Sequence, residues 1–282
     1  MRGANGSVGV VWAVLAAALA GGACGAGERP QFPGAIPLFN GTNLSGWYSW
    51  LVETKRDDPR HVFTVTHGLV RISGDGLGYL ATEEEHSDYH LIVEFKWGAR
   101  NWPWGGRMGK ASDSGVFLHS LGPDGNSHDG RGAFRAAIEC QIMQGATGDL
   151  LLIRGTNADG SIIAPRVTVA VQSQRDAEGW PFADFFGPRE TVERWGRVNW
   201  ANKSREWKDL FDFRGPRDAE KPRGEWNELA ITCQDDHIRV ELNGTVVNEA
   251  HRVWPRRGKI LLQCEGSEIF FRRVALVPIA RR

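Results

Sequence analysis

The sequence predicts an all-β protein built as an antiparallel β-sandwich. Many short runs of alternating apolar and polar residues are separated by turns, which is the pattern of half-buried strands. Glycine is abundant, with 35 residues in a chain of 282, as expected where many turns connect strands. Helical periodicity is weak throughout, and only a short helical turn is expected, near residues 205–211. Strands that follow one another without intervening helices favour two packed antiparallel sheets.

The expected strands follow in order along the chain. They cover residues 62–72 (a hairpin around Thr66-His67-Gly68), 79–82, 89–97, 114–120, 136–143, 150–154, 167–172, 226–232, 237–242 and 245–248. Asn243-Gly244 is the strongest two-residue hairpin signal. Two apolar runs flank Glu265-Gly266-Ser267-Glu268, so a closing hairpin is predicted at residues 258–276.

Residues 1–24 have the features of an export signal. Arg2 supplies the positive start, and residues 8–20 form an apolar run too short for a confident membrane span. Ala18-Leu19-Ala20 suits an ordinary signal peptidase, whereas Gly21-Gly22-Ala23-Cys24 resembles a lipoprotein processing site. We therefore expect an exported protein, either a periplasmic or outer-membrane/surface-anchored lipoprotein or a soluble one. Membrane contact is expected only through a lipid on Cys24.

The rest of the chain is predicted to be one domain. Residues 25–37 form a linker containing Gly and Pro, and residues 38–282 form the sandwich. Residues 174–224 are polar, rich in Trp, Arg and Pro, and lack sustained periodicity. They are interpreted as a loop insertion that folds over the sheet, and its length favours a functional role.

Charge and cysteine content exclude several function classes. The 34 basic and 34 acidic side chains balance, so no electrostatic case exists for binding nucleic acid or an anionic membrane. Cys140, Cys233 and Cys264 each stand in an apolar run, which indicates buried thiols instead of disulfides. None of the cysteine spacings suits a zinc site.

Acids and amides share one face of two strands that are far apart in the sequence. Because side chains alternate along a strand, Glu139 and Gln141 lie opposite the apolar positions of their strand. Gln263 and Glu265 have the same relation to the apolar positions of the later strand. A solvated strand face usually mixes Lys, Thr, Ser and Arg. This selection therefore indicates that both strands line one concave, functional surface.

Seven short motifs, in order from about residue 38 to about residue 277, resemble a known bacterial family. They are Leu38-Phe39-Asn40-Gly41 with Leu44-Ser45-Gly46-Trp47, Asp113-Ser114-Gly115-Val116, Ile138-Glu139-Cys140-Gln141-Ile142, Gly148-Asp149, Trp226-Asn227, Leu242-Asn243-Gly244, and Leu262-Gln263 followed by Glu265-Gly266 and Phe270-Phe271-Arg272-Arg273. The family is the 3-keto-disaccharide hydrolase domain. The resemblance implies a jelly-roll sandwich of the concanavalin/laminarinase kind.

The resemblance also implies a reaction on an oxidised sugar, a 3-keto glycoside. A ketone at C3 acidifies the hydrogen at C2, so a general base can remove it and the C1 substituent can leave by β-elimination. Addition of water then completes a net hydrolysis. This chemistry needs a base, an acid and a group that stabilises the enolate. Glu139, Glu265 and His119 are the catalytic candidates on matching motifs.

Further residues are expected to bind the sugar. Gln141 and Gln263 are amides on the polar face, and Trp102, Trp104 and Trp200 lie in loops where they could stack on a sugar ring. Asp149 and Arg272 are added as binding candidates, with a turn-forming role and a structural ion pair as their respective alternatives. The sequence motifs assign no cofactor. A divalent metal could polarise the ketone, with His119, Glu139 and Glu265 as candidate ligands.

Two other functions stay open. Laminarinase-type glucanases carry Glu-x-Asp-x-x-Glu on a concave strand, but here Glu139 is followed by Gln141 and Gln144. A retaining glycosidase needs two carboxyl groups about 5 Å apart, and an amide can replace neither of them. A conventional β-glucan hydrolase would therefore have to recruit Glu265. A non-catalytic carbohydrate-binding module is the other alternative.

Overall fold

The computed structural model describes residues 34–103, 106–193 and 195–280. The predicted export signal, the lipid site at Cys24, most of the linker and Trp104 lie outside the described residues. Residues 34–282 form one compact unit. The described part of the chain contains no α-helix, and none that could cross a membrane.

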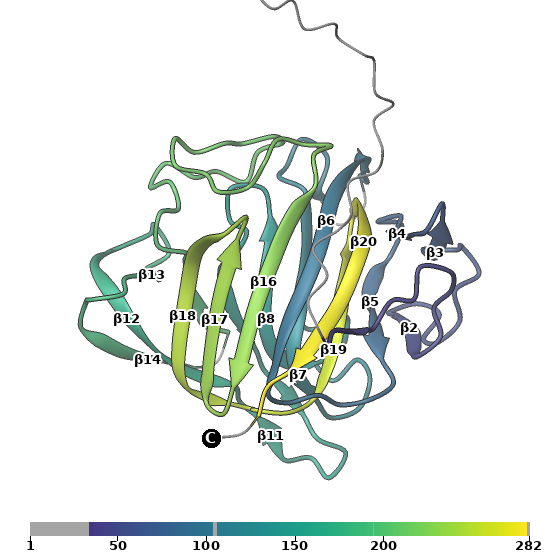
Figure 1. The fold of residues 1–282 in the computed structure, drawn as a ribbon, viewed down its shortest axis with the longest axis horizontal. Helices are drawn as coiled ribbons and strands as arrows, with labels where there is room; N and C mark the ends of the chain where they lie inside the picture. The colour runs from purple at the N-terminus through teal and green to yellow at the C-terminus, as the bar shows by residue number, and fades with distance from the viewer. Residues whose placement is uncertain (1–33, 104–105, 194, 281–282) are drawn as a thin grey trace, which may run out of the picture. The chain divides into compact units, whose positions relative to one another are not determined.

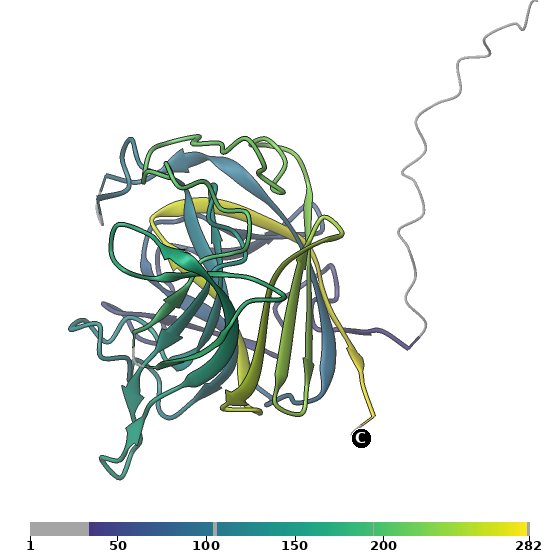
Figure 2. The ribbon, with the colours of Figure 1, turned by 90° about the vertical axis from the view of Figure 1, so that its left-hand side faces the viewer.

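The unit contains two antiparallel sheets, seen as a front and a back layer in Figure 1 and turned by 90° in Figure 2. The eleven-stranded sheet has the order β13 (Pro181–Ala183), β12 (Arg166–Arg175), β18 (Thr245–Trp254), β17 (His237–Leu242), β16 (Asn227–Gln234), β6 (Tyr89–Asn101), β20 (Ser267–Pro278), β4 (Leu69–Ile72) and β3 (Phe63–Thr66), with β1 (Ile36–Pro37) beside β20 and β14 (Arg189–Glu193) beside β12.

The seven-stranded sheet has the order β15 (Arg197–Val198), β9 (Leu150–Ile153), β8 (Ala136–Met143), β7 (Asp113–Leu121), β19 (Lys259–Glu265), β5 (Leu77–Thr82) and β2 (Trp47–Leu51). A two-stranded ribbon, β10 (Gly155–Thr156) and β11 (Ile162–Ile163), lies apart from both sheets. The predicted all-β sandwich is therefore confirmed.

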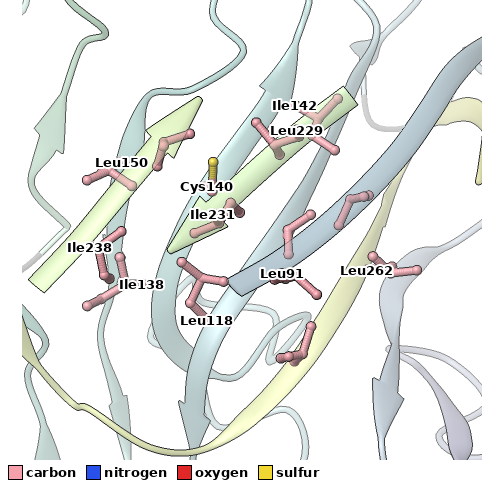
Figure 3. Close-up of a cluster of buried hydrophobic side chains, with 14 of the residues drawn as sticks. Leu91, Leu118, Ile138, Cys140, Ile142, Leu150, Leu229, Ile231, Ile238 and Leu262 are labelled. Atoms are coloured by element: carbon pink, nitrogen blue, oxygen red, sulfur yellow. The ribbon is translucent and has the colours of Figure 1, made fainter. Parts of the chain in front are cut away.

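The hydrophobic core lies between the two sheets. Figure 3 shows Leu91, Leu229 and Ile231 of one sheet facing Ile138 and Cys140 of the other, and all of them are buried. Because every second residue of β8 and β19 enters this core, the intervening residues must point away from the eleven-stranded sheet. The three cysteines of the domain are buried free thiols, as predicted.

The closing hairpin was predicted wrongly. β19 and β20 follow one another across Gly266, but β19 pairs with β5 and β7 while β20 pairs with β4 and β6. The turn at Gly266, with a positive φ of 77°, carries the chain from one sheet to the other. The same turn residues suit a hairpin between two paired strands and a connection between strands of different sheets. The sequence pattern therefore could not distinguish these two arrangements.

The insertion at residues 174–224 is more ordered than a loop. β13 and β14 extend the eleven-stranded sheet, and β15 forms the edge of the seven-stranded sheet beside β9. The segment 205–211 forms turns instead of the expected helical turn. Its position is fixed by Gln144, whose side-chain oxygen accepts a hydrogen bond from Asp212 N at 3.1 Å. Gln144, the last polar residue of the Glu-x-Gln-x-x-Gln pattern, therefore holds a loop instead of lining a sugar site.

Candidate functional site

The outer face of the seven-stranded sheet carries a pocket of about 370 Å³. This volume is within the usual range for a small-molecule site, about 300–1,000 Å³. The lining residues come from the central strands and from the loops above them: Asp113, Asp129, Phe134, Glu139, Gln141, Met143, Leu151, Ile153, Glu178, Trp195, Arg197, Trp207, Asp209, Gln263 and Glu265. The polar face predicted from two distant strands is thus one shared pocket.

Strand alternation explains why the acids and amides meet here. Glu139 and Gln141 on β8 point into the pocket, as do Gln263 and Glu265 on β19. β7 lies between β8 and β19, and it places Gly115 opposite Gln141 in the ladder. The absence of a side chain at Gly115 leaves room above the floor of the pocket between the two polar strands.

The two amides are oriented by the two acids beside them. Gln141 Nε2 donates a hydrogen bond to Asp113 Oδ1 at 2.7 Å, and Gln263 Nε2 donates to Glu265 Oε2 at 2.9 Å. The amide oxygens of Gln141 and Gln263, and Oε1 of Glu139, are buried without a hydrogen-bond partner. Buried unsatisfied acceptors are costly, so these three oxygens mark a place prepared for hydroxyl donors or a cation.

Two arginines balance the acids. Arg107 contacts Asp113 at 3.6 Å and is fixed by Asp209, whose Oδ1 accepts a hydrogen bond from Nη2 at 2.9 Å. Arg197, from β15, forms an ion pair with the fully buried Asp149 at 3.0 Å. Asp209 therefore fixes the guanidinium of Arg107, and Asp149 fixes that of Arg197. Both positive charges act on the pocket acid Asp113.

Burial raises the pKa of three of the carboxyl groups that line the pocket. The pKa of Glu139 lies well above its usual value because of burial first, and then because of the charges of Asp113 and Glu265. Burial, followed by the charge of Asp113, raises the pKa of Glu265 to about 8. Burial raises the pKa of Asp113 to about 6, against the opposing effect of Arg107 and Arg197. Three carboxyls facing two guanidiniums favour a site that retains a proton near neutral pH.

These shifts predict how stability depends on pH. A carboxyl whose pKa is raised by folding binds its proton more tightly in the native state, so its contribution to stability is lost as pH rises toward the folded pKa. The lowered pKa of His119 has the opposite effect on stability, but only below the ordinary histidine pKa of about 6.5. We expect the free energy of unfolding to fall between pH 6.5 and 8, because of Glu265 and Glu139.

The measurement is urea unfolding across that range, with the Glu265→Gln variant beside the parent protein. Removal of the titrating carboxyl is expected to flatten the decline. A free energy of unfolding that rises with pH, or an equal slope in both proteins, would contradict the proposed proton retention.

Gly115 provides a second prediction. A Cβ atom at this position would lie 2.3 Å from Glu139 Oε1, so an alanine forces the carboxyl out of its place. The obstructing atom is the end of a flexible side chain, and the fold can accommodate the change. In an assay with the 3-keto glucoside expected from the sequence, Gly115→Ala should lower kcat by about 10²-fold. A displacement of about 1 Å at a reacting group can have an effect of this size. The melting temperature should change little.

A double-variant comparison separates this effect from general damage. In a Glu139→Gln background, Gly115→Ala should cause little further loss, because the displaced group no longer acts. If the losses in kcat caused by Gly115→Ala and by Glu139→Gln were additive in the double variant, Gly115 would have a role that does not depend on Glu139.

The structure does not place His119 in the pocket. Strand alternation would put it on the same face as Phe117, but the ladder between β7 and β8 is irregular between Leu118 and Leu121. His119 has a positive φ of 53°, is buried against Tyr89 and hydrogen-bonds through Nδ1 to Pro255 O at 2.9 Å. Burial lowers its pKa to about 4. Its predicted roles as catalyst and metal ligand are therefore withdrawn.

Two of the predicted tryptophan platforms also lie elsewhere. Trp200 is buried in the core, and its Nε1 donates to Gly145 O at 3.1 Å. Trp102 donates from Nε1 to Ser73 O at 2.8 Å and does not line the pocket. Both indoles therefore fix loops to the sheets. The described aromatic residues that face the pocket are Phe134, Trp195 and Trp207.

Asp149 and Arg272 have structural roles in place of direct binding. Asp149 is inaccessible to solvent and binds Lys203 at 2.6 Å as well as Arg197. It supports the pocket through Arg197 and through its backbone oxygen, which accepts a hydrogen bond from Gln141 N at 2.9 Å. Arg272 pairs with Glu94 on the eleven-stranded sheet at 2.5 Å, away from the pocket, and its guanidinium lies over the ring of Trp226.

Asp113, Arg107 and Arg197 were not identified from sequence as residues of the site. Asp113 was noted only within the Asp113-Ser114-Gly115-Val116 motif, although its alternation with Gly115 could have placed it on the polar face. Arg107 and Arg197 come from a glycine-rich loop and from the insertion. Neither lies in a periodic segment, so no sequence signal was available.

The donor set of the pocket suits a hard cation. Carboxylates of Asp113, Glu139 and Glu265 and the amide oxygens of Gln141 and Gln263 are oxygen ligands of the kind that Ca²⁺ and Mg²⁺ prefer. Three of these oxygens lack any hydrogen-bond donor in the structure. The three carboxylates are not among the described groups whose ligand atoms lie close enough to share one ion, so a cation would require them to move, whereas sugar hydroxyls can bind each oxygen separately.

Comparisons with known proteins agree with a carbohydrate-active role. Residues 34–277 match the family model described as the 3-keto-alpha-glucoside-1,2-lyase-like domain. No curated protein matches the sequence significantly.

Solved structures with similar folds share little sequence with the chain. A glycosyl-hydrolase-like protein from Parabacteroides distasonis is 15% identical, with 88% of this chain and 94% of that one covered and a TM-score of 0.47. The β-glucanase of Bacillus licheniformis is 13% identical over 89% of this chain and 100% of its own, with a TM-score of 0.43. A carbohydrate-binding module from Bacillus subtilis is 12% identical over 81% and 93%, with a TM-score of 0.41.

Proposed function

The chain belongs to the 3-keto-alpha-glucoside-1,2-lyase-like domain family, and from this premise we propose that it cleaves 3-keto glycosides by proton abstraction at C2. Elimination of the C1 substituent and addition of water would follow. The family supports a carbohydrate substrate in general. The residues of the pocket support the preference for the oxidised sugar and the mechanism.

One observation carries this proposal: three carboxyl groups with raised pKa values share one pocket, with Arg197 in its wall and Arg107 in contact with Asp113. Abstraction of a hydrogen from carbon needs a base stronger than an ordinary carboxylate, and a pKa near the working pH is best for general acid–base catalysis. Burial raises the pKa of Glu139 above that of an ordinary carboxyl group, and it raises the pKa of Glu265 to about 8. A lectin-like module would bind sugar without needing carboxyl groups of raised pKa.

In the first step, the Glu139 carboxylate takes the proton from C2. The electron pair of the C2–H bond forms a C2=C3 double bond, and negative charge develops on the C3 oxygen. A fixed positive charge stabilises such an enolate because it is already oriented when the charge forms. Arg197 is suited to this role because Asp149 holds it in place at the pocket wall.

In the second step, the electron pair returns from the C3 oxygen, a C1=C2 double bond forms and the C1–O bond breaks. The departing oxygen takes a proton from Glu265, which is protonated near neutral pH because its pKa is about 8. Water then adds at C1 and gives a proton to the Glu265 carboxylate, and C2 regains a proton from Glu139. The net result is hydrolysis, and both carboxyl groups return to their starting states.

A divalent cation is part of the proposal as an option. When bound to the oxygens of Asp113, Glu139, Gln141, Gln263 and Glu265, it would supply Lewis-acid polarisation of the ketone. The arginines, the acids and the amides would bind and orient the sugar in either case.

The test is incubation of the purified protein with a 3-keto glucoside, such as 3-keto-trehalose, and with the corresponding unoxidised sugar. Turnover of the keto sugar alone is the expected result. Equal cleavage of the unoxidised sugar would favour conventional glycoside hydrolysis by Glu139 and Glu265. Binding of both sugars without turnover would favour a carbohydrate-binding module.

A further inference from the structure

A cluster of metal-ligating side chains lies on the outer face of the eleven-stranded sheet. The register of β17 and β18 pairs Ile238 with Ala250, and both face the core. The residues on either side therefore point outward, and His237 comes to lie opposite His251, with Glu249 beside them. The pocket of the proposed reaction lies on the other sheet, so this cluster plays no part in it.

The three side chains are close enough to share one ion. The rings of His237 and His251 are stacked, with centroids 4.7 Å apart and planes 17° from parallel. His237 Nε2 lies 2.7 Å from Glu249 Oε1. One ligand atom from each of the three residues lies within 4.8 Å of the others. All three side chains are partly exposed, so small rotations can bring their ligand atoms to a common point.

We propose that His237, Glu249 and His251 form a binding site for a borderline divalent metal ion, Zn²⁺ in the first instance. Two imidazoles and one carboxylate are a ligand set that Zn²⁺ accepts, and they leave a fourth position open. Imidazole ligands favour this class of ion over Ca²⁺ and Mg²⁺, which prefer oxygen donors.

The surroundings of the cluster suit an ion with an open position. Glu249 and His251 line a hollow of about 250 Å³ together with Asp184, Arg189 and the two phenylalanines at 185 and 186. Asp236 and Glu249 bring negative charge near His251, and Arg189 brings positive charge.

The test is calorimetric titration of ZnCl₂ into the full domain prepared without a histidine tag. The proposal predicts one Zn²⁺ per chain. It also predicts at least about tenfold weaker binding in both His251→Gln and Glu249→Gln, since even outer-shell changes cost about 10–100-fold. His67→Asn, which changes an exposed histidine in the β3–β4 turn, should leave the affinity unchanged. Far-UV circular dichroism and melting curves verify that each variant is folded.

Three results would overturn the proposal. These are no binding by the parent protein, unchanged affinity in His251→Gln and Glu249→Gln, and an equal loss of affinity in His67→Asn. A fourth variant, Glu265→Gln, tests the sugar pocket as the source of the signal. If Zn²⁺ binding disappears there but survives in His251→Gln, the ion belongs to the pocket and the cluster carries no site. Activity on 3-keto glucosides does not enter this test, so it is independent of the proposed function.

Discussion

The Glu139→Gln variant is expected to lose turnover of a 3-keto glucoside by about 10²–10⁴-fold, the range that general acid–base catalysis contributes. The amide keeps the shape of the side chain but cannot accept the C2 proton. Stability should be unchanged or slightly higher, because the substitution removes an acid that burial and its neighbours both disfavour in the charged form. Initial rates and melting temperatures check both parts.

Glu220→Gln is the matched control for this variant. Glu220 is also buried, and burial raises its pKa to about 7, but it lies outside the pocket and accepts hydrogen bonds from Trp97 Nε1 and Thr147 Oγ1. The same chemical change there should leave turnover of the folded protein nearly intact. If Glu139→Gln retained full activity, or if the control lost as much, Glu139 would not be the base.

The Asp149→Asn variant is expected to cause the largest loss of stability, about 3–5 kcal/mol, as when one partner of a buried ion pair is removed. Asp149 is fully buried, pairs with Arg197 and Lys203, and accepts a hydrogen bond from Trp200 N at 2.8 Å. An asparagine leaves the buried Lys203 and the partly exposed Arg197 without this counter-charge. Arg197 also loses the carboxylate that fixes it, so turnover should fall as well.

Urea unfolding followed by tryptophan fluorescence measures this loss. The control is Glu190→Gln, which breaks the half-exposed pair between Arg175 and Glu190 and should cost no more than about 1 kcal/mol. A second variant, Lys203→Met in the Asp149→Asn background, removes one of the stranded cations and should recover part of the stability. A loss below 1 kcal/mol for Asp149→Asn, with no recovery in the double variant, would contradict the assigned role.

The sequence predicted the parts of the site that depend on strand period. Glu139 with Gln141, and Gln263 with Glu265, lie on the pocket side because every second residue of each strand enters the core. The same rule failed at His119. There an irregularity in the ladder and a positive φ turn the side chain away, and an alternating pattern carries no sign of such a break.

Long-range contacts explain most of the remaining differences. Trp200 was expected on the surface because it lies in a non-periodic insertion. It is held in the core by two hydrogen bonds, one from its backbone N to the Asp149 carboxylate and one from its Nε1 to the backbone oxygen of Gly145. Arg197 reaches the pocket because its short strand adds to the edge of β9, more than forty residues away in sequence. These pairings depend on the whole folded domain, so no local pattern predicts them.

Cleavage of a 3-keto glucoside in D₂O tests the central claim most directly. The account predicts that the sugar released at early times carries one deuterium at C2, because C2 loses its hydrogen to Glu139 and this carboxyl exchanges its proton with D₂O before it returns one to C2. The unlabelled product, incubated with the protein for the same time, corrects for exchange after release. Cleavage that leaves the original hydrogen at C2 would show that the bond breaks without proton abstraction there, and the proposed mechanism would be wrong.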